Sequence, residues 1–167
     1  MKRNTKINLV LATVIVVVAT LLFLTGTDHT VKKPLTVSAI DRQGITVITI
    51  NRDGRQDITF NKQGDSWQMV APRHARANNT RINAVLSVLQ ARSYAQLDAG
   101  KLDLDRFDLL KPAVTLMLDD YVFSFGCDNP LEGRRYLLFQ KTIYLVDDGL
   151  YQQLQQPADF FVQTPSD

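Results

Sequence analysis

The chain has 167 residues and a formal net charge of +2 at pH 7, from 19 basic and 17 acidic residues. This length predicts one domain with an appendage rather than two full domains. Lys2, Arg3 and Lys6 lie in the first 27 residues, which hold no acid, so the remaining chain has 16 basic against 17 acidic residues. Nucleic-acid binding depends largely on basic residues that neutralise phosphates. No nucleic-acid partner is therefore expected.

Cysteine use limits how the domain is stabilised. Cys127 is the single cysteine in the sequence, which excludes an intramolecular disulfide and a multi-cysteine metal site. An exported domain of roughly 130 residues can bury about two thirds of its unfolded surface. We therefore expect it to fold on its hydrophobic core alone, with no cofactor.

An apolar segment near the N-terminus is the strongest signal in the sequence. No residue between Ile7 and Thr27 is charged, and only Thr13 and Thr20 interrupt the apolar run of residues 9–24. About 20 apolar residues in a helix span the roughly 30 Å of a bilayer core, so we predict one N-terminal transmembrane helix. Its predicted anchor residues are Leu9, Val10, Leu11, Val14, Ile15, Val16, Val17, Val18, Leu21, Leu22, Phe23 and Leu24.

Two other interpretations of this segment fit the sequence less well. A cleaved signal peptide would need a small-x-small cleavage site, which residues 25–28 (Thr-Gly-Thr-Asp) match poorly. A buried core helix would usually have a polar face, and this segment has none. The basic residues before the segment favour a cytoplasmic N-terminus, although Lys32 and Lys33 follow it. We therefore predict a single-pass protein of a bacterial inner membrane with its domain in the periplasm.

The predicted organisation has four parts. Residues 1–27 form a cytoplasmic tip and membrane anchor, and residues 28–34 form a linker rich in turn formers. Residues 35–163 form the periplasmic domain, and residues 164–167 form a tail.

The first half of the domain predicts a strand meander followed by a helix. Strands are expected at residues 35–40 and 45–50, the latter entirely β-branched, and around Ile58 and Trp67. Asp53-Gly54 and Gln63-Gly64 are turn signals between them. Asn78, Asn79 and Thr80 are good N-cap types, and apolar residues follow at helical spacing to about residue 91.

The second half repeats this order without a residue-level repeat. Residues 102–110 predict one or two helical turns, and alternating apolar residues predict strands on both sides of Asp119-Asp120 and of Gln140-Lys141. A last helix is expected at residues 149–155. The order strands, helix, strands, helix predicts an α+β fold: one N-terminal transmembrane helix, then a mainly antiparallel sheet domain with two or three helices.

Few residues carry chemistry. His29 and His74 are the only histidines, and the arginines beside His74 disfavour a bound cation. The acids from Asp98 to Asp108 lack the spacing of a calcium-binding loop and are expected to cap helices. Neither histidine is close to Cys127 in the sequence, and a single cysteine of this kind is typically structural. No metal site and no catalytic residue are predicted.

Three arginines are the candidate contacts for a ligand or partner. Arg73, Arg76 and Arg81 precede or open the predicted helix, whose N-terminal amides add positive potential. They could receive an anionic group, or they could form a solvated basic edge.

Several short motifs between residues 40 and 162 resemble one bacterial family. They are Gly64-Asp65-Ser66-Trp67 with Pro72, Ala77-Asn78 before the helix, Phe107-Asp108-Leu109 before Lys111-Pro112, Phe123-Ser124-Phe125-Gly126, and Arg135-Tyr136 leading to Ile143-Tyr144-Leu145-Val146. The pattern is similar to the periplasmic family named domain of unknown function 4340, although Asp108 stands where that family tends to have glycine. The resemblance implies an accessory role beside auxiliary subunits of gliding-motility-type ABC transporters, and it implies no catalytic residues.

Three functions follow as hypotheses. The first is a non-catalytic, membrane-anchored periplasmic module that binds a membrane-protein partner, as an accessory or scaffold subunit of an envelope or transport complex. The second is a binding module for an anionic envelope polymer or small solute, through the three arginines. The third, an enzyme that uses Cys127, lacks any supporting group of residues, and we predict no enzyme activity.

Overall fold

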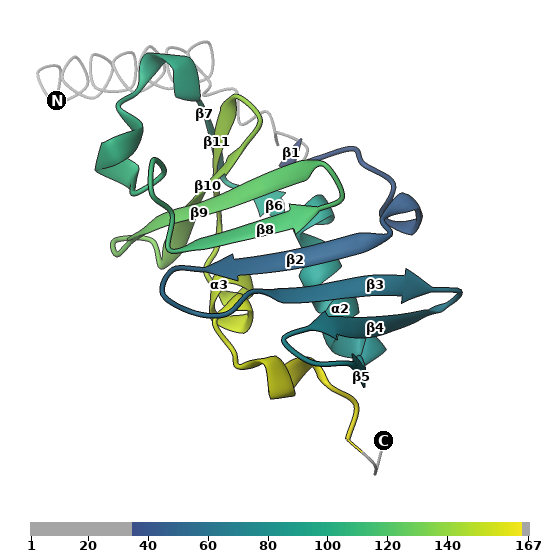
Figure 1. Ribbon diagram of the computed structural model, residues 1–167. Helices are drawn as coiled ribbons and strands as arrows, with labels where there is room; N and C mark the ends of the chain where they lie inside the picture. The colour runs from purple at the N-terminus through teal and green to yellow at the C-terminus, as the bar shows by residue number, and fades with distance from the viewer. Residues whose placement is uncertain (1–34, 165–167) are drawn as a thin grey trace, which may run out of the picture. The chain divides into compact units, whose positions relative to one another are not determined.

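The order of elements comes from a computed structural model that describes residues 35–164 (Figure 1). The strands are β1 (Leu35–Thr36), β2 (Val47–Arg52), β3 (Ile58–Gln63), β4 (Ser66–Ala71), β5 (Ala75–Arg76), β6 (Arg92–Ser93), β7 (Ala95–Asp98), β8 (Val114–Leu118), β9 (Tyr121–Asn129), β10 (Arg134–Phe139) and β11 (Thr142–Asp147). The described α-helices are α2 (Asn79–Leu86) and α3 (Gly149–Leu154). Short 3-10 helices are η1 (Arg42–Gly44), η2 (Ser87–Gln90), η3 (Ala99–Lys101), η4 (Leu104–Phe107) and η5 (Ala158–Phe161).

One large antiparallel sheet dominates this part of the chain. Its nine strands lie in the order β5-β4-β3-β2-β8-β9-β10-β11-β7, and every neighbouring pair is antiparallel. The strands of the first and second halves join where β2 pairs with β8, with Ile48 opposite Leu118 and Ile50 opposite Leu116 (Figure 1). A second, two-stranded sheet consists of β1 and β6.

The expected α+β fold with a transmembrane helix and a strands-helix-strands-helix order is wrong for the described residues. They form mainly one large antiparallel sheet, because the two predicted strand groups pair with each other through β2 and β8. The predicted helix at 78–91 shortens to α2 and then tightens into η2. Within residues 35–164, no helix is long and apolar enough to cross a membrane. The predicted transmembrane residues, 9–24, lie outside the described part.

Tight turns connect the strands because residues at the turns adopt left-handed backbone conformations. Gly54 has φ 66° and Gly64 has φ 60°, as the two turn signals of the meander predict. Asp119 also has φ 49°, which is uncommon without glycine. Its carboxylate accepts hydrogen bonds from the N–H and hydroxyl of Thr46 and from the N–H of Val47. The β8–β9 turn is thereby fixed to the beginning of β2.

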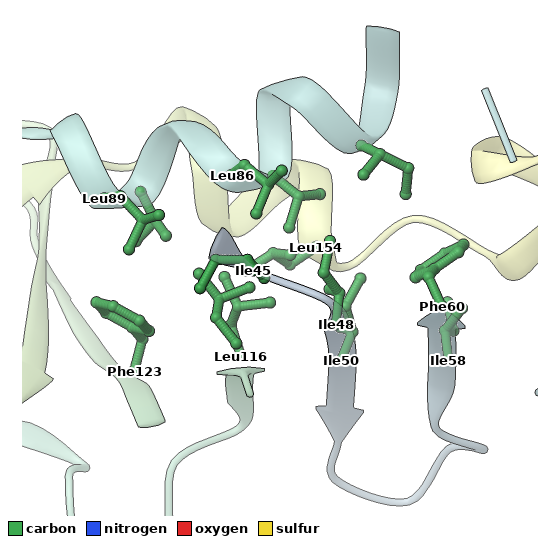
Figure 2. Packing of buried hydrophobic residues seen from close by; sticks show 14 of the residues in the cluster. Ile45, Ile48, Ile50, Ile58, Phe60, Leu86, Leu89, Leu116, Phe123 and Leu154 are labelled. Atoms are coloured by element: carbon green, nitrogen blue, oxygen red, sulfur yellow. The ribbon is translucent and has the colours of Figure 1, made fainter. Parts of the chain in front are cut away.

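The main core lies between one face of the sheet and the helices α2, η2 and α3. Figure 2 shows strand residues on one side of this layer and helix residues on the other. The labelled members are all buried: Ile45, Ile48, Ile50, Ile58, Phe60, Leu86, Leu89, Leu116, Phe123 and Leu154. Full burial of one such side chain stabilises the fold by about 1.5–3 kcal/mol.

Helix α2 begins where the sequence predicts. The side-chain oxygen of Asn78 accepts a hydrogen bond from the N–H of Arg81, which satisfies one of the free donors of the first turn. Ile82 and Val85, three residues apart, then point into the core. The cap and the apolar stripe together orient the helix over the sheet.

The opposite face of the sheet is covered only in part. The segment between β7 and β8, which contains η3 and η4, lies against β9 and β10: Phe107 packs edge-to-face on Tyr136, with ring centroids 4.8 Å apart. Gly126 on β9 lies directly beneath this segment, since a Cβ added there would be 2.0 Å from the carbonyl oxygen of Phe107. Ile143 and Leu145 are buried but lie outside the main core cluster. This second layer therefore covers the β9–β11 side and leaves the middle of the sheet open.

Two arginines fasten helix α3 to the β2–β3 turn. The guanidinium of Arg52 donates to the carbonyl oxygens of Gln156 (2.7 Å) and Gln56 (2.9 Å), and Arg55 donates to Gln155 (3.0 Å). Burial, and next the charge of Arg55, lowers the pKa of Arg52. Positive side chains are stabilising at the carbonyl-rich C-terminus of a helix, so both arginines have a structural role.

Candidate interaction surface

The open face of the sheet carries a group of apolar side chains that are not covered by the helices, which we call the open patch. It consists of the exposed Val47 on β2, Met117 on β8 and Val122 on β9, and of the half-buried Leu138 on β10. The strand register places them together: Met117 lies opposite Val122, and Leu138 lies opposite Ser124, two residues further along β9. Val122 is 44 % exposed and Met117 is 38 % exposed, whereas Leu116, Leu118 and Phe123 beside them, which point to the helix side, are fully buried.

A hollow extends the open patch towards the turns at the ends of β9 and β10. It has a volume of about 470 Å³. Its lining residues are Asp120, Tyr121, Val122, Ser124, Leu138, Phe139 and Gln140. The lining combines apolar side chains with hydroxyl, carboxamide and carboxylate groups. Such a mixture is typical of surfaces that bind another protein, because these interfaces combine apolar and polar contacts.

The alternation of apolar and other residues along the strands is the sequence pattern that indicates this surface. Val114, Leu116 and Leu118 alternate along β8 and are buried, so Met117 between them points outward. An outward methionine and an outward Val122 on adjacent strands mark an apolar face on both sides of the sheet. The sequence could not show which of the two faces the helices cover.

The structure brings the three candidate arginines together around the C-terminal segment. Arg73 pairs with Asp159 at 2.5 Å. Arg81 donates to the carbonyl oxygen of Phe160, and its guanidinium lies 4.3 Å from the centre of the Phe160 ring. These two arginines therefore hold η5 against the start of α2, and their cationic groups are already engaged.

Arg76 is exposed and, unlike Arg73 and Arg81, its guanidinium has no ion pair or hydrogen bond with the described residues. It lines a hollow of about 200 Å³ at the N-terminus of α2, together with Ala77, Asn78, Asn79, Thr80 and Gln163. The polar atoms of Asn78 and Asn79 already bond within the domain, to Arg81 and to the backbone of Trp67 and Asp65. In this hollow, an anion could therefore contact one guanidinium, that of Arg76, beside the N-terminus of α2.

The residues with reactive or metal-binding side chains do not form a site in the described part of the chain. Between residues 35 and 164, no three His, Cys, Asp or Glu side chains are grouped to hold a metal ion. Asp98 and Asp103 cap η3 and η4 by accepting hydrogen bonds from the N–H groups of Gly100 and Asp105. His74 is exposed, and His29 lies outside the described residues.

Cys127 is half-buried, with its Sγ 4.0 Å from the carbonyl oxygen of Arg106. Burial, and next the nearby Asp108 carboxylate, raises the pKa of the thiol. A raised pKa means less thiolate at neutral pH, and the thiolate is the reactive form.

Iodoacetamide should therefore alkylate Cys127 more slowly in the folded chain than in the same chain unfolded in urea at pH 7. Mass spectrometry of timed samples measures this, and faster alkylation of the folded chain would contradict it.

A comparison with protein families, curated proteins and solved structures found no match to this chain. The resemblance to the periplasmic domain of unknown function therefore stays a prediction.

Proposed function

We propose that this chain is a non-catalytic, single-pass membrane-anchored module that binds a protein partner through its open patch. The apolar segment of residues 9–24 holds it in a bacterial inner membrane, with the N-terminus in the cytoplasm and the folded domain in the periplasm. It serves as an accessory or scaffold subunit of an envelope or transport complex.

The observation that carries the binding role is the uncovered middle of the sheet. The helices α2, η2 and α3 pack on one face and the η3–η4 segment covers part of the other, yet Met117 and Val122 stay exposed. A contiguous apolar patch on the surface of a folded domain is typical of a site that binds another protein. Membrane anchoring is supported by the sequence alone, through the uncharged segment and the basic residues before it.

The experiment is co-purification of the tagged full-length chain from membranes in mild detergent. The wild type should retain a membrane-protein partner in a fixed ratio. Val122→Glu should lose that partner while keeping its circular dichroism spectrum and melting temperature, because Val122 is largely exposed. Leu102→Glu is the matched control, since Leu102 is 37 % exposed and lies outside the open patch. Equal partner recovery with Val122→Glu and the wild type would contradict the proposal.

Arg76 supports a second function, the binding of an anionic envelope polymer or small solute. Arg73 and Arg81 already have partners in Asp159 and Phe160, so this function rests on Arg76 and the α2 N-terminus. Arg76→Ala should weaken binding of an anionic glycan in calorimetry without lowering the melting temperature. Unchanged binding would exclude this function.

A further inference from the structure

The strand β7 forms an uncovered edge of the large sheet. It pairs with β11 on one side, and no described strand pairs with its other side. The opposite edge differs, because the C-terminal segment closes it. There Ala77 bridges to Val162, and the N–H of Gln163 donates to the carbonyl oxygen of Arg76 at 3.0 Å. Natural proteins usually protect long sheet edges, since a bare edge pairs with other strands.

The backbone register shows which groups of β7 are free to pair. The N–H of Ala99 donates to Lys141 on the β11 side at 3.0 Å, and hydrogen-bonding directions alternate along an antiparallel strand. Leu97 therefore also points its backbone groups towards β11, and Gln96 and Asp98 point theirs away from it. Within residues 35–164, no backbone hydrogen bond outside the β7–β11 ladder reaches Gln96 or Asp98.

A row of apolar side chains crosses the sheet and stops at this edge. Leu138 lies opposite Ile143, and Ile143 lies opposite Leu97. Ile143 is fully buried, whereas Leu97 is 38 % exposed. Side chains directly opposite each other on neighbouring strands contribute to sheet stability, so one more apolar residue beyond Leu97 would continue the row.

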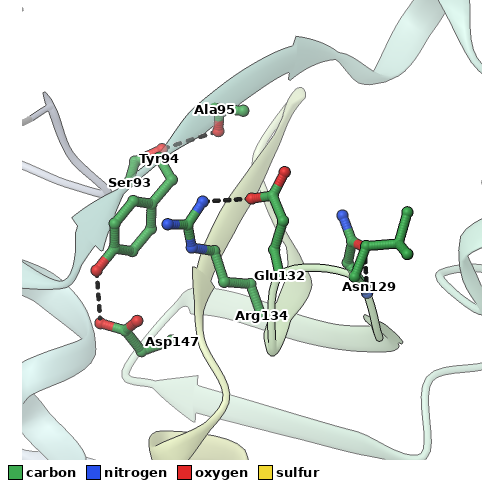
Figure 3. A network of polar contacts seen from close by, with 8 residues as sticks. Ser93, Tyr94, Ala95, Asn129, Glu132, Arg134 and Asp147 are labelled. Atoms are coloured by element: carbon green, nitrogen blue, oxygen red, sulfur yellow. Dashed lines mark hydrogen bonds and ion pairs between the residues drawn. The ribbon is translucent and has the colours of Figure 1, made fainter.

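Polar contacts hold the edge in place. Tyr94, just before β7, donates its hydroxyl to Asp147 at 3.3 Å, and the guanidinium of Arg134 lies 3.5 Å from the centre of the Tyr94 ring (Figure 3). The N–H of Tyr94 donates to Leu145 at 2.9 Å. The strand is therefore already positioned for pairing, which lowers the entropic cost of adding a partner.

We propose that a second copy of this chain pairs with β7, edge to edge and antiparallel, about a two-fold axis through Leu97. In this register Leu97 lies against Leu97 of the second copy, and the apolar row continues from one sheet into the other. Gln96 lies opposite Asp98 of the second copy, so that its carboxamide can donate to the carboxylate. The interface is isologous, as in most symmetric dimers.

Two other registers are disfavoured by the side chains and backbone of β7. An axis through Asp98 would place two carboxylates directly opposite each other, which is destabilising. An axis through Gln96 would need the backbone of Tyr94, whose N–H already bonds to Leu145. A foreign strand could also add to this edge, but the self-complementary order of Gln96, Leu97 and Asp98 favours a second copy.

Cysteine cross-linking of the full-length chain tests this pairing. In a Cys127→Ser background, Leu97→Cys places two thiols on the axis, and copper-catalysed oxidation should produce a disulfide-linked dimer. Met117→Cys is the matched control, because Met117 has the same exposed fraction, 38 %, on the open patch. Equal cross-linking rates for the two variants would overturn the proposal, as would cross-linking of Leu97→Cys only to other proteins.

A second variant separates pairing from chance collision. Gln96→Pro removes the outward N–H without touching the β11 ladder, and proline is tolerated on the free side of an edge strand. It should reduce Leu97→Cys cross-linking to the rate of the Met117→Cys control. If this variant does not fold, Leu97→Lys, which opposes two positive charges, should sediment as a monomer where the wild type forms dimers. Persistence of the dimer with Leu97→Lys would overturn the pairing. Neither result depends on membrane anchoring.

Discussion

Replacement of Gly126 by alanine should lower the free energy of unfolding by about 3 kcal/mol. A Cβ at this position would lie 2.0 Å from the carbonyl oxygen of Phe107 and 2.9 Å from Leu109 Cδ2. The first of these is a backbone atom, so relief requires the whole η3–η4 segment to move away from β9. That movement would also disturb the packing of Phe107 on Tyr136. Urea unfolding followed by circular dichroism measures the loss.

Gly44→Ala is the control for this effect. Nothing lies within 4 Å of a Cβ added at Gly44, and its backbone is not left-handed. The substitution should change the free energy of unfolding by less than about 0.5 kcal/mol in either direction. Similar stability of the two alanine variants would show that the η3–η4 segment does not cover β9 as described.

The second large effect is expected at Arg135, the buried charged residue of β10. Its side chain donates to Asp148 and to the carbonyl oxygen of Gly126, both at 2.5 Å, and its guanidinium lies 3.6 Å from the centre of the Tyr151 ring. Arg135→Met leaves the carboxylate of Asp148, which is 26 % exposed, without this partner. We expect a loss of about 3 kcal/mol, at the low end for a broken buried pair because water still reaches Asp148.

Arg73→Met is the control, because it removes an ion pair with the same distance between nitrogen and oxygen but at the surface. Arg73 and Asp159 also approach to 2.5 Å, but their side chains are 54 % and 78 % exposed. Exposed ion pairs contribute about 0–1 kcal/mol, so this variant should unfold at nearly the wild-type urea concentration. Equal losses for Arg135→Met and Arg73→Met would contradict a burial-dependent role for the Arg135 pair.

Local elements were predictable because their signals are local. Asp53-Gly54 and Gln63-Gly64 form turns, and Asn78 caps α2, as turn and cap chemistry predict. The β-branched run at 45–50 contributes to β2, although the observed strand begins at Val47 and ends at Arg52.

Long-range pairing was not predictable for a physical reason. The β2–β8 pair and the β7–β11 pair join segments far apart in sequence. Register between such strands depends on the whole core rather than on neighbouring residues. The strand predicted at 35–40 is shorter for a similar reason: after Thr36 the backbone leaves the ladder, and Ser38 bonds to the carbonyl of Leu89.

The candidate site was predicted only in part. The arginine spacing places Arg73, Arg76 and Arg81 near one helix start, but their partners, Asp159 and Phe160, come from the other end of the domain. No pattern of neighbouring residues in the sequence predicts these contacts between the arginines and the C-terminal segment. The open patch depends on which face of the sheet the helices cover, and that choice is made by tertiary packing.

The location of the domain is tested most directly by a C-terminal alkaline phosphatase fusion to the full chain, expressed in a Gram-negative bacterium. This enzyme is active only after export from the cytoplasm, so we expect activity that sediments with the membrane fraction and is released by detergent. An inactive fusion, or intact fusion recovered in the soluble cytoplasmic fraction, would contradict a membrane-anchored periplasmic module.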